Sequence, residues 1–371
     1  MYFKNVKTIF FTLSLMITIL ACGLPSAAEV TEVPATEVAQ EISQEATQES
    51  TRPPTEVAVV TIQHQIIPVS LPDQHSGQAG DFDSSTSIEN QTAVGGDRFT
   101  YGRFERPFNA NTMDVYFSQL DIVNTQVSQD DTWIYGGMLL KGLNNDSSSA
   151  AQYAVELDTD LDGKGDWLII AIKPTSTEWT VNGVQVYGDT NNDVGGQLPT
   201  LTDKAQVNGD GFETLVFDQG KGDDSDSAWV RISSNDPNMV EISIKKSVVG
   251  NPQKYLINMW AGTSLLNPAL FDLNDHFTHE QAGAADKGLQ NYYPIKEVFE
   301  IDNSCRMAVG FQPTGNEPGI CESLIPVNEQ QPLPSGPSGC QATSADISAC
   351  NQDVYCGWNA SSCSCVCKIP G

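Results

Sequence analysis

The stretch AVELDTDLDGKGDWLII, residues 154–170, decides the expected fold class because it places an acidic turn between two short apolar runs. Each run has the length of a strand, since strands usually contain roughly three to ten residues. The aspartates and glycines between the runs are common turn residues. The stretch therefore predicts two neighbouring β-strands joined by a negatively charged loop.

A similar pattern continues on both sides of this stretch, from residue 59 to residue 302, where Gly, Asn, Asp and Pro separate short apolar or alternating runs. The expected strands are 59–70, 114–123, 132–141, 152–158, 166–173, 178–187, 212–217, 228–233, 239–246 and 255–261. Within one of these runs, Asn182-Gly183 predicts a hairpin turn, because both residues tolerate positive φ. About ten strands without a long helical period predict an all-β fold, an antiparallel β-sandwich or jelly roll, and we assign it to residues 59–327.

The acidic turn has the spacing of a calcium loop, which places carboxylates at positions one, three and five and glycine at position six. Gly163 occupies the sixth position, but Ile169 stands where an EF-hand would have its final glutamate, so the loop is of a shorter type. We expect calcium to be bound by Asp158, Asp160, Asp162, Lys164 (through its carbonyl) and Asp166. The alternative is an acidic turn that is simply solvated.

A second stretch, YGDTNNDVGG, repeats the alternation with Asp189, Asn191 and Asp193. It lacks the central glycine and a fourth carboxylate, so it is a weaker calcium candidate than the first loop. An ordinary turn rich in Asn and Asp is the preferred interpretation.

Residues 130–170, which contain DDTWIYGGMLLKG and QYAVELDTDLDGKGDWLII, resemble the strand pairs of exported bacterial β-sandwiches. These sandwiches include carbohydrate-binding modules of the ninth family and DOMON-like domains. The resemblance implies a sandwich that binds a sugar or haem and in which calcium has a structural role.

The start of the chain predicts export and lipid attachment. Lys4 and Lys7 precede an apolar run at residues 9–20, so residues 1–21 read as a signal peptide. The sequence before Cys22 resembles a bacterial lipobox, which implies a lipid-anchored protein at the cell surface or envelope, outside the cytoplasm. Residues 22–58 lack aromatic residues and predict a disordered Thr/Glu/Pro linker. The formal net charge of −28 argues against a nucleic-acid partner, whose phosphates require a basic surface.

The cysteines predict disulfides near the end of the chain. Nine cysteines are present, and eight remain once Cys22 is assigned to lipidation. Outside the reducing cytosol we expect these eight to pair: Cys305, Cys321, Cys340, Cys350, Cys356, Cys363, Cys365 and Cys367. The first two would close one loop, and the last six allow fifteen pairings, which stay open. Residues 328–339 form a second expected linker, and residues 340–371 a small cysteine-rich module.

No nucleophile elbow, phosphate-binding loop or dinucleotide-binding glycine pattern stands out in the chain. The leading hypothesis is a non-enzymatic, calcium-stabilised binding module that binds carbohydrate through tryptophans or tyrosines on an exposed sheet face. One alternative is a secreted glycoside hydrolase that uses two carboxylates. The other is a structural component that binds an envelope protein.

Overall fold

The computed structural model describes residues 62–69, 75–93, 97–99, 102–143, 150–195, 209–263, 265–271, 273–283 and 294–321, together with the strands at 356–359 and 364–367. The expected signal peptide, Cys22 and both linkers lie outside these residues, as does most of the cysteine-rich module. Within the described residues, no helix is long and apolar enough to cross a membrane.

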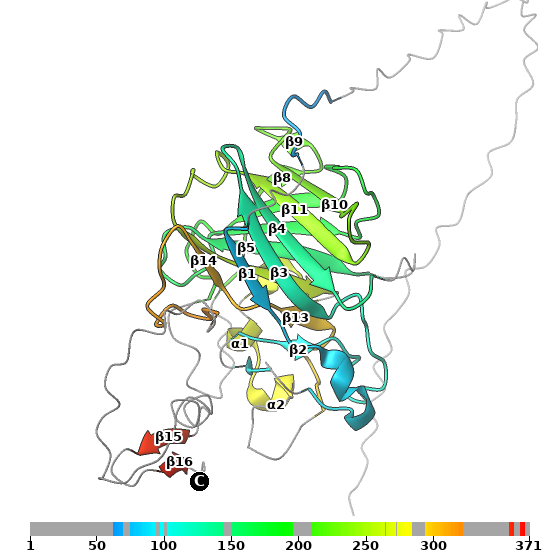
Figure 1. Cartoon of the computed structure of the whole chain (residues 1–371), viewed down its shortest axis with the longest axis vertical. Helices are drawn as coiled ribbons and strands as arrows, with labels where there is room; N and C mark the ends of the chain where they lie inside the picture. Colours follow the sequence, from blue (N-terminus) through cyan, green and yellow to red (C-terminus); the bar gives the residue numbers. More distant parts are fainter. Residues whose placement is uncertain are drawn as a thin grey trace, which may run out of the picture. The chain divides into compact units, whose positions relative to one another are not determined.

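The first sheet is antiparallel, and its strands run β1-β3-β4-β11-β10 (Figure 1). Their bounds are Gly77–Gly80 (β1), Ile122–Gln129 (β3), Trp133–Leu140 (β4), Met239–Lys245 (β11) and Ala228–Ile232 (β10). Two of the four pairings join strands that follow each other in the chain (β3–β4 and β10–β11), and the other two (β1–β3 and β4–β11) join distant segments, so the sheet assembles from three separate parts of the chain.

The second sheet is also antiparallel, and its strands run β2-β13-β12-β5-β6-β7-β8-β9, with β14 also paired to β12. Their bounds are Glu105–Arg106 (β2), Ile301–Asn303 (β13), Tyr255–Gly262 (β12), Gln152–Asp158 (β5), Trp167–Ile172 (β6), Val184–Gly188 (β7), Thr214–Asp218 (β8), Lys221–Gly222 (β9) and Met307–Val309 (β14). A separate two-stranded sheet pairs β15 (Cys356–Asn359) with β16 (Ser364–Cys367).

The two larger sheets share one hydrophobic core. Val127 and Ile134 of the first sheet belong to the same buried cluster as Val155 and Leu157 of the second. The sheets approach closely at Gly136 in β4, where an added Cβ would lie 2.7 Å from Cγ2 of Val155. Glycine is therefore required there because the partner sheet occupies the space that a side chain would need.

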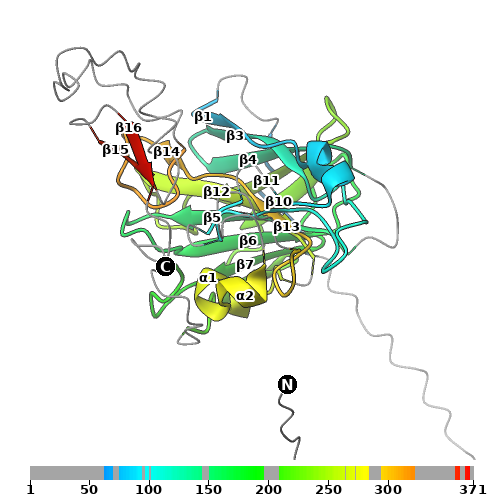
Figure 2. The ribbon, with the colours of Figure 1, turned by 90° about the horizontal axis from the view of Figure 1, so that it is seen from below.

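A second core covers the outer face of the larger sheet. Because strand side chains alternate in direction, Leu168 and Ile170 of β6 point away from the shared core. They pack with Trp260 of β12 and with residues of two short helices, α1 (Leu273–His276) and α2 (His279–Ala282), which lie beside β6 and β7 in Figure 2. Two 3-10 helices, Ser84–Asn90 and Pro268–Leu270, also lie in the described chain. With apolar groups on both faces, the central strands are continuous apolar runs in the sequence.

The prediction of an all-β fold with antiparallel sheets is confirmed. The finer description as a sandwich or jelly roll stays a prediction. The expected strand at 152–158 coincides with β5, whereas the strand expected at 114–123 is wrong, because β3 begins only at Ile122.

The strand expected at 59–70 is also wrong for its described part. The backbone N–H groups of Gln65 and Ile66 donate to the carboxylate of Asp226, at 2.8 and 3.0 Å, instead of to a neighbouring strand. A side chain far away in the sequence therefore replaces the sheet as the partner of this apolar segment.

The Asn182-Gly183 turn forms, but the expected hairpin around it does not. The amide of Val184 donates to the carbonyl of Val181 at 3.1 Å, which closes the turn. Thr180, however, bridges Val230 of the first sheet, while β7 begins at Val184 in the second sheet. The turn therefore carries the chain from one sheet to the other.

Candidate metal centre

The acidic loop joins β5 to β6 and is held at both ends by central strands of the larger sheet. Asp158 ends β5 and pairs with Leu256 of β12. At the other end of the loop, the amide of Asp166 donates to the carbonyl of Leu157 at 2.8 Å. The hairpin therefore brings Asp158 and Asp166 to the same end of neighbouring strands, although seven residues of loop separate them.

Asp158 also shapes the loop by accepting two backbone hydrogen bonds. Its Oδ1 accepts from the amide of Leu161 at 2.6 Å, and its Oδ2 accepts from the amide of Gly163 at 2.9 Å. Gly163 has φ of 94°, a conformation that side chains other than glycine rarely adopt. The glycine at the sixth position thus makes the tight turn that the spacing predicted.

Three of the expected ligands converge. One carboxylate oxygen from each of Asp158, Asp160 and Asp166 lies within 4.8 Å of the other two. Calcium binds oxygen at about 2.3–2.6 Å, so two oxygens on one ion can be up to roughly 5 Å apart. Asp158 is buried, Asp166 half-buried and Asp160 exposed, which leaves room for water to complete the coordination. This donor set therefore fits a calcium ion.

The other two expected ligands lie outside this group. Oδ1 of Asp162 accepts from the amide of Lys164 at 2.8 Å, and its Oδ2 accepts from the side-chain amide of Asn192 at 2.8 Å. Lys164 forms an isolated antiparallel bridge with Gly195, and its amine donates to the carbonyl of Asn192. Both residues thus tie the acidic loop to the loop after β7.

Burial and one arginine set the electrostatics of the site. Burial raises the pKa of Asp158 to about 6, although Arg306 acts in the opposite direction. Nη1 of Arg306 lies 4.0 Å from Oδ2 of Asp158 and donates to the carbonyl of Gly163 at 2.7 Å, while its Nη2 donates to Oε1 of Glu156 at 3.0 Å. Sequence reasoning missed Arg306, because no spacing links it to the loop that it supports.

The weaker calcium candidate is organised differently. Both carboxylate oxygens of Asp189 accept backbone hydrogen bonds, at 2.7–3.1 Å, from four successive amides at residues 191–194. The side chain of Asn191 donates to Asp210, and Oδ2 of Asp193 accepts from the amide of Asp210. Asp189 therefore caps a turn, and the three residues are not among the convergent acidic groups of the described chain. Calcium binding here stays a prediction.

Three of the five tryptophans whose side chains are described are too buried to contact a ligand. Trp133, Trp229 and Trp260 are buried, while Trp167 and Trp179 are half-buried. For Trp358, the remaining tryptophan, only the backbone is described. An exposed sugar-stacking surface therefore cannot use the three buried rings.

A polar aromatic surface does lie on the outer face of β7 and β8. Val184 and Val186 point into the shared core, so Gln185 and Tyr187 lie on the opposite face, where Tyr187 is half-buried against the second core. The hydroxyl of Tyr187 donates to Oε1 of Gln185 at 3.0 Å, and the amide of Gln185 donates to Asp218 at 3.1 Å. Opposite Tyr187 stands Leu215, which is 48% exposed. We call Gln185, Tyr187, Leu215 and Asp218 the β7–β8 surface.

One disulfide lies within the described residues. Cys305 and Cys321 are bonded, as the sequence predicted. For Cys356, Cys365 and Cys367 only the backbone is described, with Cys356 paired opposite Cys367 in the register of β15 and β16. Cys340, Cys350 and Cys363 lie outside the described residues, so the remaining pairings stay predictions.

Comparisons with known proteins supply no independent assignment. No family model matches the chain, and neither a curated protein nor a solved structure matches it. The function has to be inferred from the residues of the site.

Proposed function

We propose that this protein is a non-enzymatic binding module, stabilised by calcium and held at the bacterial cell surface by a lipid on Cys22. The convergence of Asp158, Asp160 and Asp166 carries the calcium part of the proposal. The resemblance of the sequence before Cys22 to a lipobox supports the anchor, and the acidic composition favours attachment through acyl chains over binding to anionic headgroups.

The role of calcium at this site is structural. Asp158 ends β5, Asp166 immediately precedes β6, and Asp160 lies in the loop between them. The ion would neutralise three carboxylates that otherwise repel one another and would fix the loop in one conformation. Because the ion binds the folded loop, its binding free energy adds to the stability of the sheet.

Calcium should raise the stability of the wild-type chain, and Asp160→Ala should lose the increment due to this site. At calcium concentrations about one hundred times the dissociation constant, one site contributes roughly 2.7 kcal/mol. For a domain of this size, that corresponds to about 5–10 °C in melting temperature. Thermal melts with calcium and with chelator measure the increment.

Asp223→Ala is the matched control, because Asp223 is an exposed loop aspartate that does not belong to the convergent group. It should keep the wild-type calcium response. Because Asp160 is exposed, its replacement should change the melting temperature in chelator very little. An Asp160→Ala chain with the full wild-type response to calcium would contradict a calcium site in this loop.

Carbohydrate is the ligand class that we propose for the β7–β8 surface. The exposed part of the Tyr187 ring and the side chain of Leu215 supply apolar surface, while Gln185 and Asp218 supply donors and acceptors for hydroxyl groups. The bonds from Tyr187 to Gln185 and from Gln185 to Asp218 orient these groups before a ligand arrives, which reduces the entropic cost of binding.

The wild-type chain should bind glycans on an array in the presence of calcium, and Tyr187→Ala should weaken that binding about tenfold. This factor corresponds to a loss of roughly 1.4 kcal/mol, typical of truncating an aromatic contact residue. Tyr187→Phe is the matched control, because it keeps the ring and removes only the hydroxyl. An array without any bound glycan would count against carbohydrate, and equal binding by Tyr187→Ala would exclude this surface.

A further inference from the structure

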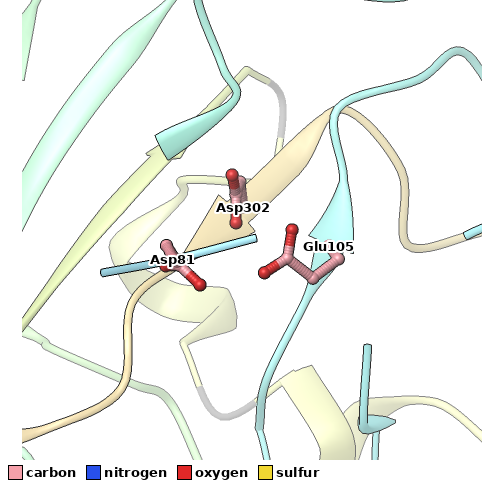
Figure 3. Close-up of side chains that lie close together, drawn as sticks. All are labelled: Asp81, Glu105 and Asp302. Carbon is pink, nitrogen blue, oxygen red and sulfur yellow. The ribbon is translucent and has the colours of Figure 1, made fainter. Parts of the chain in front are cut away.

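A second acidic cluster lies where the two larger sheets meet. Asp81 follows β1 of the first sheet, while Glu105 and Asp302 belong to β2 and β13 of the second. One carboxylate oxygen from each residue lies within 4.8 Å of the other two. Figure 3 shows the three carboxyl groups pointing toward one another. The fold thus brings together three acids that are far apart in the sequence.

The sheet register makes this arrangement unfavourable without a compensating charge. Glu105 and Asp302 stand directly opposite each other in the β2–β13 pair, and like charges at such positions destabilise a sheet. Glu105 is 1% exposed and Asp302 is 0% exposed, so water does not screen their repulsion. This buried pair of carboxylates therefore needs a proton or a cation to compensate its negative charge.

Each carboxyl group is held by a hydrogen bond, yet two of them retain an oxygen without a partner. The donors are the amide of Phe82 to Asp81, the hydroxyl of Ser84 to Glu105 and the amide of Ile122 to Asp302, at 2.7–3.0 Å. Among the described residues, no hydrogen bond reaches Oδ2 of Asp81 or Oδ1 of Asp302, although both atoms are buried. Buried polar atoms normally have partners, so these two oxygens indicate a ligand that completes the cluster.

The neighbouring cations balance the cluster only in part. Arg106, which follows Glu105, directs its guanidinium to the buried carboxylate of Asp97 at 2.7 Å. Burial raises the pKa of Asp81, and a side-chain hydrogen bond with Glu105 and the charge of Arg103 offset only part of that rise. Burial raises the pKa of both Glu105 and Asp302 well above the ordinary range, and the neighbouring carboxylates raise it further. The cluster therefore takes up either protons or a metal ion.

We propose that Asp81, Glu105 and Asp302 form a second calcium site, which links β1 to the β2–β13 pair. The donors are hard carboxylate oxygens without nitrogen or sulfur, a set that suits calcium rather than zinc or copper. One ion would supply the missing partner for both orphan oxygens at once. Because the amide of Asp81 donates to the carbonyl of Val123 after β1, the ion would connect the two sheets at this junction.

The test is calcium stoichiometry, measured by equilibrium dialysis of the purified full chain after removal of metal with chelator. Glu105→Gln and Asp302→Asn should each bind one calcium equivalent fewer than wild type. Asp160→Ala should lose a different equivalent, so its combination with Glu105→Gln should lose both. If the loop at Asp158 does not bind calcium, Asp160→Ala leaves the stoichiometry unchanged while Glu105→Gln still loses one equivalent.

Melting temperatures with and without calcium provide a second test that does not depend on the stoichiometry. In chelator, Glu105→Gln should melt at or above the wild-type temperature, because the amide replaces, at nearly constant volume, a buried carboxyl group that must either take up a proton or repel its neighbours. In calcium, the order should reverse. Wild-type stoichiometry in both variants, with the variants more stable in both buffers, would overturn the proposal in favour of a shared proton. If Asp302→Asn does not fold, Asp81→Asn makes the same test at a half-buried position.

Discussion

An Arg106→Ala variant should be less stable than wild type by about 3–5 kcal/mol, because the substitution leaves the carboxylate of Asp97 buried without its charge partner. Both side chains are fully buried, and Nε and Nη2 of Arg106 donate to the two oxygens of Asp97 at 2.7 and 3.3 Å. This bidentate interaction fixes the orientation of the two groups and also pairs their charges, so lysine should not replace arginine here.

Arg106 also joins segments that no strand connects. Its Nη1 donates to the carbonyls of Ala282 and Val298, each at 3.1 Å, and its guanidinium lies over the rings of Phe99 and Phe104. Removing the side chain therefore leaves two buried carbonyls without this donor and opens a cavity beside the second core. These losses place the expected effect at the upper end of the range.

Chemical denaturation of the purified chain measures the change in the free energy of unfolding. Two further variants serve as comparisons. Lys254→Ala, at an exposed position, should change the free energy of unfolding by less than about 0.5 kcal/mol. The double variant Arg106→Met with Asp97→Leu should recover much of the loss, since it removes both charges together. A loss below about 1 kcal/mol for Arg106→Ala would show that water reaches Asp97 in solution.

The sequence indicates those features that depend on neighbouring residues. The run at 152–158 forms β5 with the expected bounds, because both of its faces are covered and its apolar residues are continuous. The acidic loop is similarly local: alternate aspartates and one glycine predict a turn, and the hairpin brings three of the carboxylates together. The pairing of Cys305 with Cys321 also follows from their proximity in the chain.

Features that depend on distant partners could not be predicted in the same way. The apolar segment at 62–69 has the composition of a strand, yet Asp226 binds its amides. Asp81, Glu105 and Asp302 have no common spacing, and only the pairing of β2 with β13 and the position of β1 bring them together. An isolated acidic residue in a short strand gives no sign of such a cluster, because its partners are determined by topology.

Replacing both Cys305 and Cys321 with alanine should lower the free energy of unfolding by about 3 kcal/mol, within a range of about 2–5. The bond closes a loop with a sequence separation of 16 and thereby restricts the unfolded chain. The same loop contains β14, which pairs with β12 in the larger sheet. The double variant is preferable to a reducing agent, because a reductant would act on every disulfide of the chain.

The variant should also loosen the acidic loop, because the disulfide holds the arginine that supports it. The amide of Arg306 donates to the carbonyl of Gly319 at 2.7 Å, the amide of Cys321 donates to the carbonyl of Arg306 at 2.8 Å, and Nη1 of Arg306 donates to the carbonyl of Gly163. In the double variant, hydrogen exchange should therefore become faster at the backbone amides of Arg306, of position 321 and of Gly163. Acceleration confined to residues 305–321 would show that the loop is held by its own aspartates, and unchanged stability would contradict a structural role for the bridge.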